Sequence, residues 1–226
     1  MSAQKLVGVD GCRGGWIAAT RQGVRLVERV AELFRGSDAP AVVAIDIPIG
    51  LADRGARRCD EEARRRLPGR ASSVFRPPIR PMLVARSQSE ASAIGRSLDG
   101  KGVSAQCWAI ADKIREVDEL VRDEPAARRA LHEVHPELAF ALMNGGALAE
   151  RKRTAAGGAQ RRALLEAPFG ALVREASPRD LGCRPDDVLD AFAALWSAER
   201  IARGEAVTLP ADPPRDAHGI AMSISA

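Results

Sequence analysis

The chain of 226 residues is long enough for one large domain, and its 46% apolar residues exclude a disordered protein. No apolar run reaches the roughly 20 residues that a membrane-spanning helix needs, and the N-terminus lacks a signal-peptide pattern, so we expect a cytoplasmic protein with no membrane partner. The net charge is +4, and the four cysteines are far apart without a C-x-x-C pair, which argues against a zinc site or a disulfide framework.

The first part of the chain predicts an antiparallel meander followed by a buried strand. Short apolar and β-branched segments alternate with glycine turns, which is typical of strands joined by hairpins. The next apolar run has no polar alternation, which indicates a strand covered on both faces beside a parallel neighbour. The expected strands are 6–9, 16–20, 24–30 and 41–45, with turns at 11–15 and 22–23 and a short helix at 31–34.

The rest of the chain predicts mainly helices. Proline and glycine are frequent in residues 68–81, so we expect an irregular region there with helical patches on both sides. Two longer segments carry an apolar stripe at helical spacing. The expected helices are 60–67, 87–96, 106–121, 160–165 and 185–202, and the expected strand is 130–140, which Pro136 ends.

This order of elements predicts an α/β fold of the RNase H-like type. The expected sheet is mixed and five-stranded, with three antiparallel strands and then parallel strands, and helices flank it. We expect a single domain over 1–226, in which residues of about 50–125 form an insertion of helices and loops between strand four and strand five.

Four aspartates fall where such a sheet binds ligands. Asp10 closes the first strand and Asp46 closes the fourth, and the carboxyl ends of neighbouring parallel strands meet at one edge of the sheet. Asp187 and Asp190 are three residues apart and share one face of the last helix. An N-cap role explains Asp186 or Asp187 but not Asp190, which stands among apolar residues.

Carboxylates that converge repel one another, and a divalent cation relieves the repulsion. Hard oxygen ligands favour Mg²⁺ or Mn²⁺ as the cofactor, and two such ions can clamp an in-line phosphoryl displacement. We therefore interpret Asp10 as a metal ligand beside a glycine turn that lets a phosphate approach. The alternative is an ion pair between Asp10 and Arg13 at a hairpin.

The segment HEVHPE adds further candidates. On a strand, Glu133, His135 and Glu137 point the same way, so Glu133 would join the carboxylates and His135 would orient water or bind phosphate. Ion pairs with nearby arginines are the alternative. The two histidines are three residues apart, so the H-E-x-x-H zinc pattern is not present.

Basic residues suggest a polyanionic partner. Nine arginines stand against three acids between Arg54 and Arg80, which suits a phosphate backbone, although a solvated face is the alternative. Lys152, with Arg161 or Arg162, lies near a glycine pair and suits a phosphate contact. Phe75 is the one aromatic residue placed to stack on a base, whereas the three tryptophans are expected in the core.

The set of motifs resembles a known family. GVDGCRGGW, DIPIGL, RRCDEEAR, SSVF, EVHPELAF and DDVLDA, in this order from about residue 5 to about residue 222, resemble domain-of-unknown-function family 429, described as predicted nucleases of the RNase H-like superfamily, which includes Holliday-junction resolvases. The resemblance implies a metal-dependent phosphodiesterase. It supports the acidic set and marks pocket residues, which are Arg58, Asp60, Arg64, His135, Glu137 and Lys152.

We therefore predict a metal-dependent nuclease with a two-metal mechanism, nucleic acid as partner and a homodimer as a further candidate assembly. The alternatives are a non-catalytic or small-molecule-binding module and an ATP-binding phosphotransferase, which the missing Walker pattern disfavours. The predicted catalytic residues are Asp10, Asp46, Glu133, Asp187, Asp190 and Lys152, and the five acids are also the predicted metal ligands. The predicted substrate contacts are Arg13, Arg58, Asp60, Arg64, Arg80, His135, Glu137 and Arg161.

Overall fold

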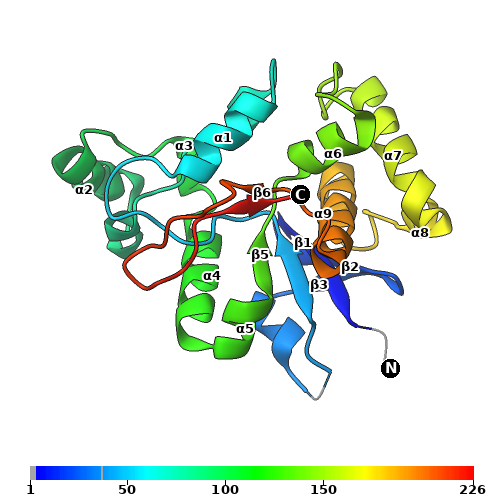
Figure 1. Ribbon diagram of the computed structural model, residues 1–226, viewed down its shortest axis with the longest axis horizontal. Coiled ribbons are helices and arrows are strands. Elements are labelled where there is room, and N and C mark those ends of the chain that lie inside the picture. Colours follow the sequence, from blue (N-terminus) through cyan, green and yellow to red (C-terminus); the bar gives the residue numbers. More distant parts are fainter. Residues whose placement is uncertain (1–3, 37) are drawn as a thin grey trace.

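A five-stranded mixed sheet forms the centre of the computed structural model, which describes residues 4–36 and 38–226 (Figure 1). The strand order is β3-β2-β1-β4-β5, with β1, β2 and β3 antiparallel and β1, β4 and β5 parallel. This confirms the expected mixed sheet of three antiparallel strands followed by parallel ones. The strands are β1 (Leu6–Cys12), β2 (Gly15–Thr20), β3 (Gly23–Val27), β4 (Val42–Ile45) and β5 (Leu131–Glu133).

The first hairpin is tighter than the sequence suggests. Strand β1 continues through Gly11 to Cys12, which pairs with Gly15, so only Arg13 and Gly14 form the turn. Gly15 has a φ of 143°, and a Cβ there would lie 2.2 Å from the carbonyl oxygen of Val27. Strand β3 ends at Val27 and not at residue 30, because the chain turns there into the 3-10 helix η1 (Val30–Phe34).

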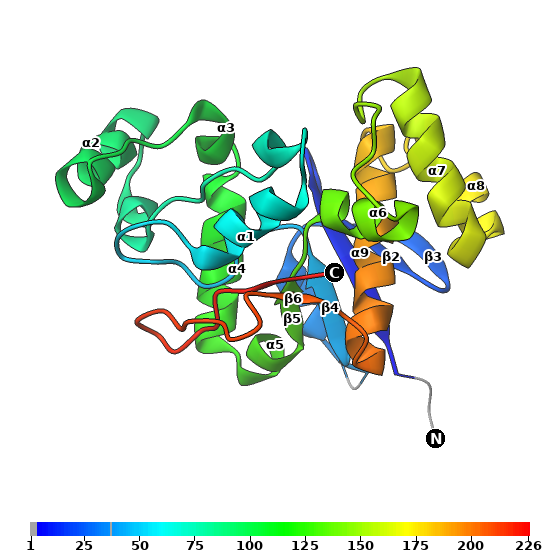
Figure 2. The ribbon, with the colours of Figure 1, turned by 45° about the horizontal axis from the view of Figure 1, so that its top comes forward.

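Two helices lie on opposite faces of the sheet (Figure 2). Helix α4 (Ala111–Asp123) packs its apolar residues against the face that carries Val9 and Ile45. Helix α9 (Pro185–Arg203) covers the other face and lies against β1 at Gly8. A Cβ at Gly8 would lie 2.0 Å from the backbone nitrogen of Leu195, so only glycine permits this approach.

The segment between β4 and β5 is mostly helical. The expected helix 106–121 is two helices, because the chain breaks at Ala109 and Ile110 before α4 begins. Besides α4, the segment contains, in chain order, α1 (Arg58–Arg66), η2 (Ala71–Ser73), η3 (Arg80–Val84), α2 (Gln88–Asp99), α3 (Ala105–Trp108) and, after α4, α5 (Pro125–Ala130).

The expected strand over 130–140 is wrong beyond Glu133. Strand β5 stops at Glu133, and Pro136 opens helix α6 (Pro136–Asn144). Proline suits the first helical position because the missing N–H has no helical partner there. Helices α7 (Ala155–Phe169) and α8 (Ala171–Glu175) then lead to α9.

The last residues form a small sheet that the sequence did not predict. Strand β6 (Thr208–Leu209) pairs with β7 (Ile224–Ser225), and Ser225 also bridges to Val134 beside β5. The C-terminus therefore lies near the centre of the molecule (Figure 1). Within residues 4–36 and 38–226, no helix has both the length and the apolar character needed to cross a membrane.

Candidate active site at the carboxyl edge of the sheet

Asp10, on β1, and Asp46, directly after β4, stand side by side where two parallel strands neighbour each other. The register pairs Val9 with Ile45, and the Asp46 N–H donates to the Val9 carbonyl at 3.0 Å. Asp10 pairs with Ile17 in the hairpin, and Ile17 belongs to the core cluster formed with α9. Because side chains alternate along a strand, both aspartates lie on the α9 face of the sheet.

Helix α9 contributes two more acids. The carboxylate of Asp187 accepts a hydrogen bond from the Arg184 N–H at 2.9 Å and so caps the start of the helix. The same residue also lines the site. Asp190 lies one turn further on and is 3% exposed. The carbonyl oxygen of its neighbour Ala191 would lie 2.3 Å from a Cβ at Gly8, which shows how closely this part of α9 approaches β1.

The electrostatics of the site show that these acids form one group. Burial, followed by the negative charges of Asp190 and Asp46, raises the pKa of Asp10 well above its usual value. Burial also raises the pKa of Asp46, and it raises the pKa of Asp190 to about 6. The ionised forms of these buried carboxyls are therefore unfavourable, and a cation beside the group stabilises them.

Lys152 supplies one such positive charge. It precedes α7, and its Nζ lies 2.8 Å from Asp190 Oδ2 and 4.0 Å from Asp186 Oδ2. Burial alone would lower the pKa of Lys152, but the charge of Asp190, its hydrogen bond to the lysine and the charges of Asp46 and Asp10 together outweigh burial, and the pKa is raised. The lysine is therefore fully charged at neutral pH and lies against the acidic group.

His135 offers an unpaired ring nitrogen near the same acids. Its Nε2 lies 3.3 Å from the carbonyl oxygen of Ser73, and a carbonyl only accepts, so Nε2 carries the hydrogen. Its Nδ1 is buried and has no partner among the described residues. The His135 ring lies close enough to Asp46 to oppose the rise that burial causes in the pKa of that carboxyl.

A cleft with two lobes surrounds these residues. The first lobe has a volume of about 730 Å³ and is lined by Asp10, Arg13 and Asp187 among others. The second has a volume of about 690 Å³ and is lined by Lys152, Asp190 and Glu137 among others. The residues that line both lobes form the waist of the cleft, and they are Asp46, Phe75, Gln106 and His135.

The donor set suits a hard divalent cation held in part by water and substrate. In the described part of the chain, no group of three or more His, Cys, Asp or Glu side chains is arranged to hold a metal ion. Mg²⁺ commonly binds through only one or two carboxylates together with waters and substrate phosphates. Asp10 and Asp46 meet that requirement, because no hydrogen bond from another described residue occupies either carboxylate.

A comparison with protein-family models covers nearly the whole of the described fold. A family model described as "Protein of unknown function (DUF429)" matches residues 8–215. The chain belongs to the DUF429 family. No curated protein and no solved structure matches the sequence significantly. The matched range of the DUF429 chain includes Lys152 and the four aspartates of the site, Asp10, Asp46, Asp187 and Asp190.

Glu133 of the DUF429 chain also lines the first lobe, but it approaches from the other face of the sheet and is occupied by an arginine. It pairs in register with Ile45 and therefore faces the opposite side of the sheet. Arg57 binds its two oxygens at 2.7 and 2.8 Å, and the Ile49 N–H donates to it at 2.6 Å. Burial raises the pKa of Glu133 to about 7 although Arg57 opposes the shift. Asp60 is also bound by Arg57, at 2.6 Å, and is not a free substrate contact.

Glu137 is likewise occupied. It lies in α6, not on a strand with Glu133, and Arg161 binds both of its oxygens at 2.7 and 2.8 Å. Arg161 is 2% exposed and also donates to the carbonyl oxygens of Glu150 and Gly157. The pair therefore supports the segment that carries Lys152, although both residues line the second lobe.

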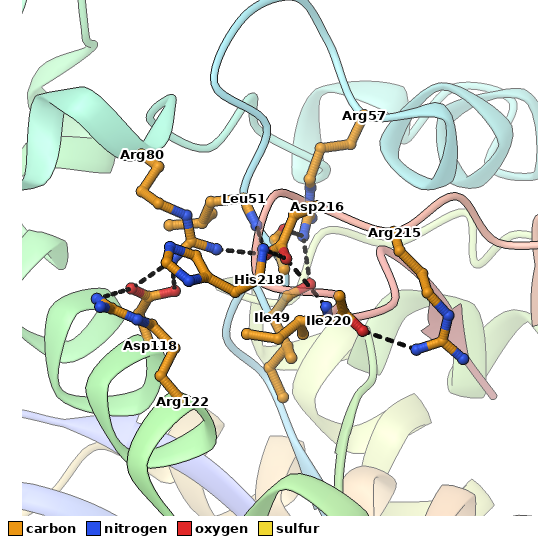
Figure 3. A network of polar contacts seen from close by, with 12 residues as sticks. Ile49, Leu51, Arg57, Arg80, Asp118, Arg122, Arg215, Asp216, His218 and Ile220 are labelled. Atoms are coloured by element: carbon orange, nitrogen blue, oxygen red, sulfur yellow. Dashed lines mark hydrogen bonds and ion pairs between the residues drawn. The ribbon is translucent and has the colours of Figure 1, made fainter.

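Three predicted substrate contacts of the DUF429 chain lie elsewhere. Arg58 has a side chain 63% exposed and lies 3.8 Å from Glu62, and Arg64 donates to the Val74 carbonyl. Arg80 binds Asp118 and Asp216 in a network that ties the C-terminal segment down, because Asp216 also accepts from the N–H groups of Leu51 and Ile220 (Figure 3). Arg13 does line the first lobe, and no ion pair joins it to Asp10 within the described residues.

Several residues of this site have only a weak signal in the sequence. Buried acids need a positively charged partner, and this is the only feature of the sequence that points to Arg57. Its partners are Asp60, three residues further along the chain, and Glu133. Lys113 lines the first lobe, and its Nζ lies 4.3 Å from the ring centre of Trp16 and donates to the Gly15 carbonyl. Trp16 is fully buried as expected, whereas the other two tryptophans are partly exposed.

Proposed function

We propose that the chain is a metal-dependent nuclease of the RNase H-like superfamily that hydrolyses phosphodiester bonds. The observation that carries the proposal is the pair of unbonded carboxylates, Asp10 and Asp46, on adjacent parallel strands, with Asp190 of the last long helix beside them. The strand order β3-β2-β1-β4-β5, with these acids on β1, directly after β4 and on α9, supports the superfamily assignment.

Asp10 and Asp46 are the residues that would hold Mg²⁺ or Mn²⁺, and Asp190 and Asp187 would add negative charge around the ion. The metal would neutralise charge on the phosphoryl oxygens and acidify a bound water. The rest follows from the chain's own residues. The Lys152 ammonium and the Arg13 guanidinium bind phosphate oxygens, because both line the cleft and carry full positive charge.

His135 is the proposed proton acceptor. Its Nε2–H donates to the Ser73 carbonyl, so Nδ1 is the nitrogen that can accept a proton, and in this proposal it takes the proton from a water molecule enclosed beside it next to Asp46. The contact to Ser73 also fixes the ring, so the acceptor nitrogen is oriented before substrate arrives.

Cleavage assays test the proposal. Single-stranded, double-stranded, branched and hybrid substrates are incubated with Mg²⁺, Mn²⁺ or EDTA. We expect cleavage that requires a divalent metal and that falls by at least about 100-fold in Asp10→Asn and Asp46→Asn, since a metal ligand supplies several kcal/mol of transition-state stabilisation. Asp123→Asn, an exposed position on α4, is the matched control and should leave the rate unchanged.

Absence of metal-dependent cleavage of every substrate by folded protein would overturn the nuclease assignment. Binding measured at several salt concentrations then distinguishes the alternative of a small-molecule or nucleotide-binding module. Contacts to a phosphate backbone produce a steep dependence on salt, whereas a small neutral ligand does not.

A further inference from the structure

We propose that the substrate is a single strand of nucleic acid that runs through both lobes of the cleft and is cut internally. This inference rests on the proposed nuclease function and adds the strandedness of the substrate and its path. Its first support is that Asp46 lies at the waist between the lobes, with Asp10 in the first lobe and Asp190 in the second, so a bound chain can continue on both sides of Asp46.

Each lobe has room for part of a polymer. Volumes of about 730 and about 690 Å³ fall within the roughly 300–1,000 Å³ typical of sites that hold one drug-sized ligand. A mononucleotide would fill one lobe and leave the other without a ligand. Two lobes of similar size on either side of Asp46 therefore favour a substrate that extends in both directions from the bond that is cut.

Positive charge lines both lobes. Arg13 lies at the first lobe, in the turn between β1 and β2, and is exposed. Arg151 and Arg153 lie at the second lobe, before α7, and are also exposed. Among the described residues no acidic side chain pairs with these three guanidinium groups, so each is available for a phosphate.

The waist carries groups that suit an unpaired base. Phe75 is half-buried and packs partly against the core on the α4 face, while it lines both lobes. An aromatic ring in a basic groove binds single strands because any base can stack on it. Gln106, exposed at the start of α3, adds an amide that can hydrogen-bond a base edge.

The depth of the acids disfavours a duplex. Asp10 is 8% exposed and Asp190 is 3% exposed, so both lie at the floor of the cleft. A duplex is stiff and carries its phosphates on the outside of a wide cylinder, whereas a single strand bends at each nucleotide. A flexible strand therefore brings a phosphate down to acids at this depth more readily than a stiff duplex does.

Binding of labelled oligonucleotides tests the path independently of cleavage. Fluorescence anisotropy in EDTA is measured with single strands of about 4 to about 16 nucleotides, which spans known single-strand site sizes, and with a duplex of the longest sequence. We expect affinity to rise with length until both lobes are filled. We expect the duplex to bind at least about tenfold more weakly than the single strand, which is a difference of about 1.4 kcal/mol.

Variants of each lobe locate the strand. Arg13→Ala and the double variant Arg151→Ala/Arg153→Ala should each weaken binding of the long strand and lower the salt slope by about 0.7 for each phosphate that the variant no longer neutralises. Phe75→Leu keeps the apolar packing against the core but removes the stacking ring, and should weaken binding by about 5- to 100-fold. Arg129→Ala, on α5 and outside the cleft, is the matched control and should bind as the unaltered protein does.

The site of cutting completes the test. A circular single strand with Mn²⁺ should be linearised, because both lobes can hold a chain that has no end. Equal affinity for duplex and single strand, equal effects of the lobe variants and Arg129→Ala, or cleavage only from strand ends would overturn the inference. If the strand binds as described and is never cut, the path stands and the nuclease function fails.

Discussion

Lys152 Nζ lies 2.8 Å from Asp190 Oδ2, so a lysine ammonium lies against one of the acids that surround the proposed metal ligands Asp10 and Asp46. Its charge also opposes the rise in the pKa values of Asp10 and Asp46 that burial causes, which indicates that it acts on the whole acidic group. Lys152 is partly exposed and comes from the segment before α7, so it can move away from the acids without disturbing the sheet. The lysine and a metal ion therefore compete for the same negative charge.

This competition makes Lys152→Gln a test of the site. The variant should bind Mn²⁺ more tightly, by about tenfold, because a competing unit charge is removed from a partly buried group. Isothermal titration calorimetry measures the affinity directly. Lys101→Gln, an exposed lysine after α2, removes the same charge elsewhere and should not change Mn²⁺ affinity. Weaker binding in Lys152→Gln would show that the lysine supports the ion and does not compete with it.

Asp10→Asn should stabilise the metal-free protein. Burial and the neighbouring acids make the ionised form of Asp10 unfavourable in the folded state, so a neutral amide of the same shape is better tolerated. We expect the free energy of unfolding in EDTA to rise by about 1 kcal/mol, and the stabilisation caused by added Mn²⁺ to disappear. Urea unfolding with and without Mn²⁺ measures both effects. Asp123→Asn should change neither, and a loss of stability in Asp10→Asn without metal would contradict the electrostatic account.

The raised pKa of Asp190 predicts a specific pH dependence. Its carboxyl has a usual pKa of 3.8 and a pKa of about 6 in the fold, so the folded chain binds this proton more tightly than the unfolded chain does. The free energy of unfolding contributed by this group therefore falls as pH rises from about 4 to about 6 and stays low above that range. Asp190→Asn should remove this slope. Urea unfolding in EDTA across that pH range, with parallel curves for the two proteins, would count against the shift.

Gly8→Ala tests the contact that brings α9 to the sheet. The added Cβ would lie 2.0 Å from the Leu195 nitrogen and 2.3 Å from the Ala191 oxygen, and backbone atoms of a long helix cannot move aside alone. We expect a loss of about 3 kcal/mol, at the upper end of overpacking costs, together with weaker Mn²⁺ binding. Gly158→Ala is the matched control on α7. Its Cβ meets open space, so it should stabilise the protein by up to about 1 kcal/mol.

Arg57 should be essential to stability because it binds two buried carboxylates. Arg57→Met leaves Asp60 and Glu133 without their partner and should lower the free energy of unfolding by about 3–5 kcal/mol at neutral pH. Adding Glu133→Gln should recover part of the loss, and a double-mutant cycle by urea unfolding measures the coupling. Arg58→Ala, the exposed neighbour, should change stability by less than about 0.5 kcal/mol. Additive effects of the Arg57 and Glu133 variants would show that the pair does not interact.

The sequence identifies the paired aspartates because their signal is local. An apolar run that ends on an aspartate is visible at Asp10 and again at Asp46, and neighbouring parallel strands bring the two ends together. The helix of Asp190 is equally clear from its apolar stripe. These features need no knowledge of distant contacts.

The position of Glu133 could not be obtained in this way. Strand β5 is three residues long, and the face on which Glu133 lies depends on its register with β4, which its own sequence does not encode. The partner Arg57 is 76 residues away and stands in a segment rich in arginine, where nothing distinguishes it from its neighbours. A proline such as Pro136 suits both the end of a strand and the first turn of a helix, and here it begins α6.

The pairing of Val9 with Ile45 has an evolutionary consequence. The separation between Asp10 and Asp46 follows from the hydrogen-bonded spacing of adjacent strands, which is about 4.8 Å whatever side chains fill the interior. Related chains can therefore exchange their interior apolar residues over long periods of divergence without moving one carboxylate relative to the other. The distance between the two carboxylates therefore depends on the backbone hydrogen bonds between β1 and β4. Any chain that keeps this pairing of strands also keeps the distance.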